Sequence, residues 1–185
     1  MLRMADEIQL VVGVAGRIGS GKSEIAHFLE NRYRFQYLRY SLVLSEWFKT
    51  DPLAKNLLQE VGWNVMSGEG QRELNTRLIA GITRGRDCAV DGLRHPIDFD
   101  SLKTAFPSGF FLVYVDTPAD IRFERLRHRY RRYEDFLAAD SHPVESNIDS
   151  LRPFALAELS GSLPIEQLGA QIHKLILAFR SGRAS

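Results

Sequence analysis

Eight consecutive residues near the start of the chain match a pattern that binds phosphate. Residues 16–23 read GRIGSGKS, which fits G-x-x-x-x-G-K-[ST]. The glycines allow the backbone to fold tightly around an anion, so that several N–H groups point at it. Lys22 can reach the β- and γ-phosphates of a nucleotide, and the Ser23 hydroxyl can ligate Mg²⁺. The pattern predicts a site for ATP and Mg²⁺ formed by Gly16, Arg17, Ile18, Gly19, Ser20, Gly21, Lys22 and Ser23.

A phosphate loop of this kind needs a carboxylate at the end of a neighbouring strand, to hold Mg²⁺ or its water shell. Asp91 directly follows the apolar residues Ala89 and Val90, and it is the residue we favour. Asp116 follows another apolar stretch and remains the alternative, although it can simply belong to the turn that begins the next helix. Asp91 is therefore predicted to be a metal ligand and a catalytic residue.

Arg94 lies three residues beyond Asp91, in the turn that we expect at the ligand-binding edge. Its guanidinium group could clamp a phosphate through two parallel hydrogen bonds, which predicts a catalytic role. The alternative is an ordinary surface arginine.

Six arginines and one histidine lie in residues 122–132, which read RFERLRHRYRR. A charge run is usually a solvated helix face, but this one follows the predicted fourth strand of a phosphate-binding domain. A basic segment closing over the phosphates would exclude water and stabilise the charge of the transferring group. Arg125 and Arg129 are expected one turn apart on the same face, one of them against the base and the other at the phosphates. A nucleic-acid-binding patch is the competing interpretation.

Apolar and amphipathic segments alternate along the chain, which implies a parallel sheet covered on both faces. Thr117 is expected to cap the helix that starts at Pro118. Strands are predicted at residues 8–15, 37–40, 88–91, 110–115 and 154–159, and helices after residue 23 and at about 42–49, 53–61, 69–83, 99–106, 118 onward and 164–179. The predicted fold is α/β: a three-layer P-loop NTPase fold with a five-stranded parallel sheet, helices on both faces and a short arginine-rich lid.

The whole chain, residues 1–185, is predicted to be one such domain. Within it, residues 41–84 form the acceptor-binding helical segment and residues 125–142 the lid. The formal net charge of +1 gives no electrostatic argument for nucleic acid or membrane as a partner. The single Cys88 excludes an internal disulfide framework, and no membrane span or signal peptide is expected. We therefore expect a cytoplasmic protein, monomer or homodimer, whose partner is a small-molecule nucleotide acceptor.

Together these motifs resemble the P-loop kinases of the nucleoside monophosphate kinase and dephospho-CoA kinase group, over roughly residues 8–179. VDGLRHP (residues 90–96) looks like a turn of adenylate-kinase-like and deoxynucleotide-kinase-like proteins, and RFERLRHR (residues 122–129) looks like their lid entry. GSLPIEQL (residues 161–168) is similar to the start of the last helix in dephospho-CoA kinases. The resemblance implies that Arg125 lies against adenine and that Arg129 contacts phosphate as a catalytic residue.

The chain departs from this group after the second strand, where many relatives carry an aspartate and an arginine for acceptor binding. Residues 40–46 read YSLVLSE and contain neither, although Arg39 precedes them. A hydroxyl acceptor benefits from a general base, whereas a phosphate acceptor is already anionic. We therefore expect transfer from ATP to a nucleoside or deoxynucleoside monophosphate. Dephospho-CoA-kinase-like phosphorylation of a hydroxyl, with Glu46 or Asp91 as base, and an ATPase or ATP-binding switch are the alternatives.

Overall fold

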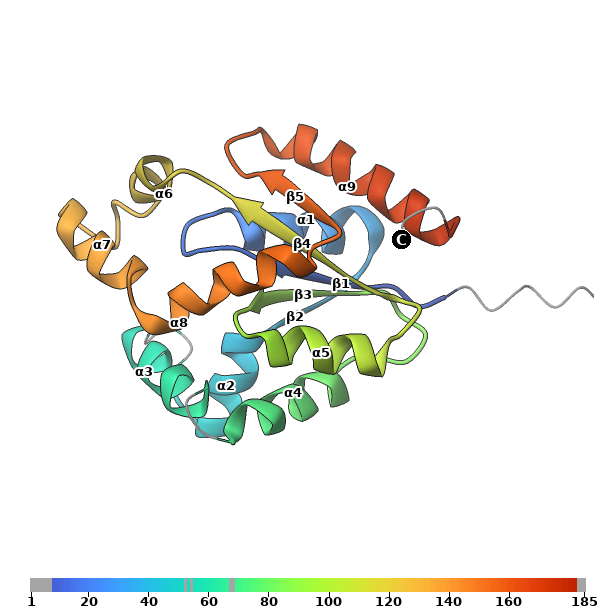
Figure 1. Cartoon of the computed structure of the whole chain (residues 1–185), viewed down its shortest axis with the longest axis horizontal. Coiled ribbons are helices and arrows are strands. Elements are labelled where there is room, and N and C mark those ends of the chain that lie inside the picture. Colours follow the sequence, from blue (N-terminus) through green and yellow to red (C-terminus); the bar gives the residue numbers. More distant parts are fainter. Residues whose placement is uncertain (1–7, 52, 54, 67–68, 183–185) are drawn as a thin grey trace, which may run out of the picture.

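Five parallel strands form one sheet at the centre of the molecule (Figure 1). The structure is a computed structural model that describes residues 8–51, 53, 55–66 and 69–182. The strand order is β2-β3-β1-β4-β5, with every neighbouring pair parallel. The strands are β1 (Val11–Ala15), β2 (Gln36–Arg39), β3 (Cys88–Leu93), β4 (Phe110–Asp116) and β5 (Ala157–Ser160).

Helices cover both faces of the sheet, so the predicted three-layer α/β fold is confirmed. Helices α1 (Lys22–Tyr33) and α9 (Ile165–Arg180) pack on one face. The other face is covered by α2 (Tyr40–Phe48), α4 (Gly70–Ala80), α5 (Pro96–Ala105) and the 3₁₀ helix η1 (Asn147–Phe154). The remaining helices are α3 (Lys55–Met66), α6 (Ala119–Arg125), α7 (Tyr133–Asp140) and α8 (Pro143–Ser146).

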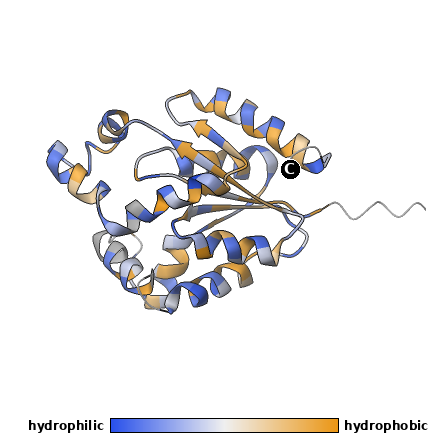
Figure 2. Ribbon diagram, viewed as in Figure 1, coloured by the Kyte–Doolittle hydropathy of each residue, from blue (hydrophilic) through white to orange (hydrophobic). Residues whose placement is uncertain are grey.

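The hydrophobic core consists of one apolar layer on each face of the sheet. Successive side chains of a strand point to opposite faces, so Val12 and Val14 pack with Leu168 of α9, whereas Val11 packs with Leu78 of α4. The three central strands β1, β3 and β4 are apolar along most of their length, and the helices place polar residues outward (Figure 2). Of the helices that the structure describes, none is long and apolar enough to cross a membrane.

The strand boundaries differ from the sequence prediction by up to three residues. Strand β3 continues to Leu93, two residues beyond the predicted end, so Asp91 lies inside the strand rather than at its end. There it is held in register between Val14 of β1 and Arg39 of β2, which fixes its position more firmly than a turn would. Strand β5 begins at Ala157 because the preceding residues form the 3₁₀ helix η1.

The prediction that Thr117 caps helix α6 is wrong. Pro118 occupies the N-cap position, and no side chain caps the helix. Thr117 is buried, and its hydroxyl instead donates to the backbone carbonyl of Ser20 at 2.9 Å. The end of β4 is thereby attached to the loop that follows β1.

Candidate active site

The loop between β1 and α1 adopts a backbone conformation that requires glycine. Gly16, Gly19 and Gly21 have φ angles of 154°, 78° and 96°, which L-amino acids with a side chain rarely adopt. A Cβ atom on Gly16 would lie 2.6 Å from both the Ser20 hydroxyl and the Val115 carbonyl oxygen. Gly21 is the N-cap of the 12-residue helix α1, and no side chain caps its first N–H groups. The uncapped N-terminus of α1 is therefore suited to bind an anion.

Lys22, the first residue of α1, is buried beside this loop. Its Nζ donates to the carbonyl oxygen of Arg17 at 3.3 Å. Burial lowers the pKa of the Lys22 ammonium, and the charges of Asp91 and Glu145 act in the opposite direction. Lys22 is thus a poorly solvated cation whose charge is balanced by two nearby carboxylates.

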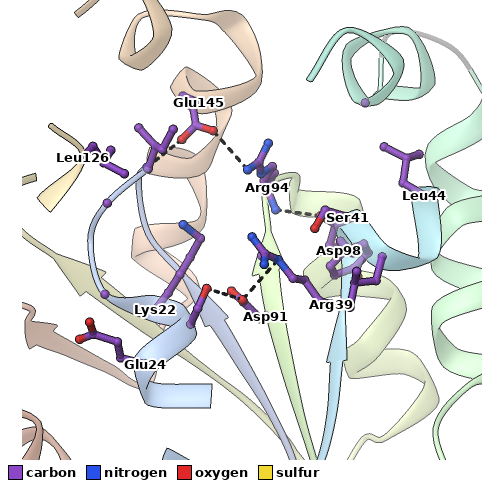
Figure 3. Close-up of a pocket in the computed structure, with 18 of the residues that line it drawn as sticks. Lys22, Glu24, Arg39, Ser41, Leu44, Asp91, Arg94, Asp98, Leu126 and Glu145 are labelled. Carbon is purple, nitrogen blue, oxygen red and sulfur yellow. Dashed lines mark hydrogen bonds and ion pairs between the residues drawn. The ribbon is translucent and has the colours of Figure 1, made fainter. Parts of the chain in front are cut away.

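Asp91 and Ser23 meet at the carboxyl edge of the sheet. The Ser23 hydroxyl donates to Asp91 Oδ2 at 2.6 Å, and the Tyr37 hydroxyl donates to the same oxygen at 3.0 Å. Arg39 Nε lies 3.7 Å from it (Figure 3). Asp91 is fully buried, and its Oδ1 has no hydrogen-bond partner.

These oxygens fit a magnesium ion. Mg²⁺ prefers oxygen ligands and is usually bound through one or two protein groups together with waters and substrate phosphates. An unpartnered buried carboxylate oxygen next to a serine hydroxyl matches that donor set. Among the described residues no group of three or more His, Cys, Asp or Glu could hold a metal, so a complete protein cage is not formed there.

Asp116, the alternative carboxylate, lies elsewhere. It is the last residue of β4, it is exposed, and its Oδ2 forms an ion pair with Arg152 at 2.9 Å. The structure therefore brings Asp91, and not Asp116, to the phosphate loop.

A cavity of about 500 Å³ extends from the phosphate loop across the edge of the sheet. Lys22 and Asp91 lie in its middle in Figure 3, and Ser41 and Leu44 of α2 lie at its far side. Residues of the loop, the second and third strands, α4 and the lid all contribute to the lining, among them Ile18, Arg39, Leu74, Arg94, Arg129 and Glu145. One continuous cavity therefore joins the phosphate loop to the segment predicted to bind the acceptor.

Arg94 points into this cavity, as the sequence analysis expected, but it does not stand alone. Its Nη2 forms an ion pair with Glu145 Oε1 at 3.3 Å. Glu145 belongs to α8 and is only 1% exposed, and its Oε2 accepts the backbone N–H of Ile18 at 3.0 Å. Sequence reasoning missed Glu145, because an isolated glutamate 122 positions after the loop motif carries no local signal.

A second missed feature is a buried polar network at the acceptor side of the cavity. Asp98 Oδ1 accepts the side-chain amides of Gln71 and of Asn75, the latter at 2.8 Å. Its Oδ2 accepts the backbone N–H groups of Arg94 and His95, at 2.9 and 3.0 Å, as part of the capping box of α5. Burial raises the pKa of the Asp98 carboxyl, and these N–H donors oppose that shift. The network fixes the turn that carries Arg94.

The two lid arginines singled out in the sequence are not on one helical face, because α6 ends at Arg125. Arg125 Nη2 donates to the carbonyl oxygen of Gly161 at 2.6 Å, and its Nη1 lies 3.3 Å from the carbonyl oxygen of Ser20. Arg129 follows in a turn and lines the cavity. Arg122 is buried, and its guanidinium forms a bidentate pair with Asp140.

Arg17 of the loop is held by the same lid region. Its Nη1 lies 3.1 Å from Asp140 Oδ2, and its Nη2 lies 2.7 Å from Asp149 Oδ2. Arg17 therefore links the phosphate loop to the end of α7 and to η1.

Comparison with known proteins identifies sequence relatives and structures of the same fold. No protein-family model matches the chain. A UPF0200 protein of Pyrobaculum aerophilum is 27% identical over 177 residues, which cover 92% of this chain and 98% of the relative. A UPF0200 protein of Halobacterium salinarum is 26% identical over 154 residues, which cover 79% of this chain and 77% of the relative.

Among solved structures, a sugar kinase from Janibacter sp. superposes with a TM-score of 0.60 at 19% identity, covering 96% of this chain and 99% of that one. Shikimate kinase from Acinetobacter baumannii gives a TM-score of 0.57 at 17% identity, with 93% and 95% covered. A gluconokinase from Sinorhizobium meliloti gives 0.58 at 16% identity, with 96% and 94% covered. The chain therefore shares the fold of these kinases.

Proposed function

We propose that this chain is an ATP-dependent kinase that transfers the γ-phosphoryl group to a small, nucleotide-type acceptor. The observation that carries the proposal is the contact between Ser23 and Asp91 beside the buried Lys22. This contact lies in a cavity that continues to Arg39 and Arg94. Room for a second molecule next to the phosphate loop supports transfer to an acceptor over simple hydrolysis of ATP.

In this proposal the loop residues 16–23 surround the phosphates, and Ser23 and Asp91 hold Mg²⁺. The metal ion neutralises charge on the phosphates. Lys22 balances the charge that develops as the bond breaks, because its poorly solvated ammonium acts in a low dielectric. Arg125 lies against the base, and Arg94 and Arg129 stabilise the transferring group from the acceptor and lid sides.

The side chains on the acceptor side of the cavity favour an acceptor that carries negative charge. Arg39 and Arg94 both line the cavity, whereas Glu46 is exposed on α2 and does not line it. A nucleoside monophosphate, as predicted from the sequence, and a dephospho-CoA-like molecule are both nucleotide-type acceptors with phosphate to place there.

A coupled ADP-release assay tests the proposal with ATP, Mg²⁺ and a panel of nucleoside monophosphates, free nucleosides and dephospho-CoA. We expect acceptor-dependent ADP release, and we expect Lys22→Ala to lower it roughly 10²–10³-fold, because it removes a charge that acts in the transition state. Lys174→Ala, at an exposed position of α9, is the matched control. Acceptor-independent ADP release would indicate an ATPase, binding without turnover would indicate a sensor, and full activity of Lys22→Ala would refute the phosphate-loop assignment.

A further inference from the structure

Glu145 is a buried carboxylate placed between the two halves of the cavity. One of its oxygens accepts the N–H of Ile18, which belongs to the loop that surrounds the donor phosphates in the proposed function. The other oxygen pairs with Arg94, at the start of the acceptor side. In Figure 3 its side chain points from α8 toward the cavity. Glu145 therefore contacts a residue of the donor loop and a residue of the acceptor side.

A buried carboxylate at this position influences whether a phosphate oxygen or a hydroxyl oxygen of the acceptor can react. Asp91 already contributes one negative charge to the cavity, and the donor brings its own phosphates. The cations that line the cavity can hold phosphates of the bound molecules, but Arg94 is already paired with Glu145. A phosphate as the reacting group of the acceptor would therefore add a further anion next to Glu145, at a cost that grows as the site is desolvated. A hydroxyl acceptor carries no charge and has a proton to lose during transfer, which a carboxylate within hydrogen-bond reach can accept.

We propose that Glu145 is the general base of the transfer and that the reacting group of the acceptor is a hydroxyl; this inference rests on the proposed kinase function. The acceptor O–H bond breaks, and its proton passes to Glu145. The acceptor oxygen forms a bond to the γ-phosphorus of ATP while the bond from that phosphorus to the bridging oxygen breaks, and ADP leaves with the electron pair. Arg94 orients the carboxylate through its ion pair.

The sharpest test is Glu145→Gln, because glutamine keeps an oxygen for the Ile18 N–H and loses the basic carboxylate together with its ion pair to Arg94. Turnover is measured with dephospho-CoA and free nucleosides as hydroxyl acceptors, and with nucleoside monophosphates as phosphate acceptors. The affinity for a non-hydrolysable ATP analogue with Mg²⁺ is measured by calorimetry. Glu166→Gln, an exposed glutamate of α9, is the matched control.

We expect a hydroxyl acceptor to be used by the wild type, with a turnover number that falls about 10²–10⁴-fold in Glu145→Gln. Analogue affinity should change by less than about threefold, since the base does not act on the bound donor. Efficient use of a monophosphate with no effect of Glu145→Gln would overturn this inference and leave the kinase function intact. So would unchanged turnover together with tighter analogue binding, which would make Glu145 only a competitor for the phosphate site. Lack of any acceptor-dependent turnover would overturn the kinase function itself.

Discussion

The donor end and the acceptor end of the cavity are constructed in different ways. The donor end is one segment of eight residues, whose glycine-dependent backbone forms the site, with Asp91 from a neighbouring strand. The acceptor end is assembled from side chains of β2, α2, α4, the turn after β3, and α8, which lie far apart in the sequence. Substitution of the charged groups at the donor end should therefore mainly affect chemistry, whereas changes in the polar network at the acceptor end should also affect stability.

Among the changes that test this comparison, the largest effect is expected from Asp91→Asn at the donor end. It keeps the size of the side chain and removes the charge next to Ser23, so turnover should fall roughly 10²–10³-fold and the Mg²⁺ requirement should rise. Asp116→Asn, an exposed carboxylate at the end of β4, which lies on the other side of β1 from β3, is the control and should change little. Titration of Mg²⁺ in the ADP-release assay measures both, and the reverse order of effects would move the acidic group to Asp116.

At the acceptor end the matching experiment is Asp98→Ala. It leaves the amides of Gln71 and Asn75 and two backbone N–H groups without their acceptor in a buried place, so the free energy of unfolding should drop by about 2–3 kcal/mol. Asp100→Ala, exposed on the same helix α5, is the control. Urea denaturation measures the loss, and a variant as stable as the wild type would remove the distinction between the two ends.

The two arginines of the lid are expected to affect different quantities, one of them ATP affinity and the other the turnover number. Arg125→Ala should weaken ATP binding about tenfold, through loss of stacking on the base. Arg129→Ala, by contrast, should mainly lower the turnover number, through lost stabilisation of the transition-state charge. Calorimetry and steady-state kinetics distinguish these outcomes. Identical profiles for both variants, or a larger effect on added DNA or RNA than on ATP, would argue against a lid.

The smallest effect concerns the attachment of the donor loop to η1. The hydrogen bond from Arg17 holds the pKa of Asp149 below its ordinary value of 3.8. A depressed carboxyl pKa contributes stability above that ordinary value, and this contribution is lost as the pH falls through the lower, folded-state pKa. Asp149→Asn should therefore be less stable than the wild type near neutral pH, and the difference should narrow below about pH 4. Thermal unfolding across pH measures it, with Asp100→Asn as control; a constant difference would contradict the assignment.

Most of the fold could be predicted from the sequence because the signals are local. Strands buried on both faces have continuous apolar sequences. The buried face of α9 is indicated by the spacing of apolar residues such as Leu168 and Ile172. The errors lie where a tertiary contact competes with a local preference. Thr117 has the residue type and the position of a helix cap, but its hydroxyl donates a hydrogen bond to the carbonyl oxygen of Ser20 instead. The regular spacing of Arg125 and Arg129 predicts one helix, but α6 ends at Arg125.

The same reasoning explains which part of the site was predictable. The residues of the phosphate loop are consecutive, and Asp91 follows an apolar run, so type and spacing were sufficient to place them together. Glu145 and the partners of Asp98 reach the cavity only because helices α8 and α4 pack beside it. No pattern in one sequence connects Glu145 to Ile18 across 127 positions. The two candidates for a general base that the sequence offered, Glu46 and Asp91, therefore did not include Glu145.

The contacts behind the phosphate loop have a consequence for the thermodynamics of binding. The carbonyl oxygen of Ser20 accepts from Thr117 and Arg125, and Arg17 is held by Asp140 and Asp149. A loop fixed by side chains on its outer side has already lost its conformational entropy when the protein folds, so a ligand does not have to order it. Affinity for the nucleotide should then depend on residues such as Thr117, and natural variation directly after β4 could tune it without altering the eight residues of the loop.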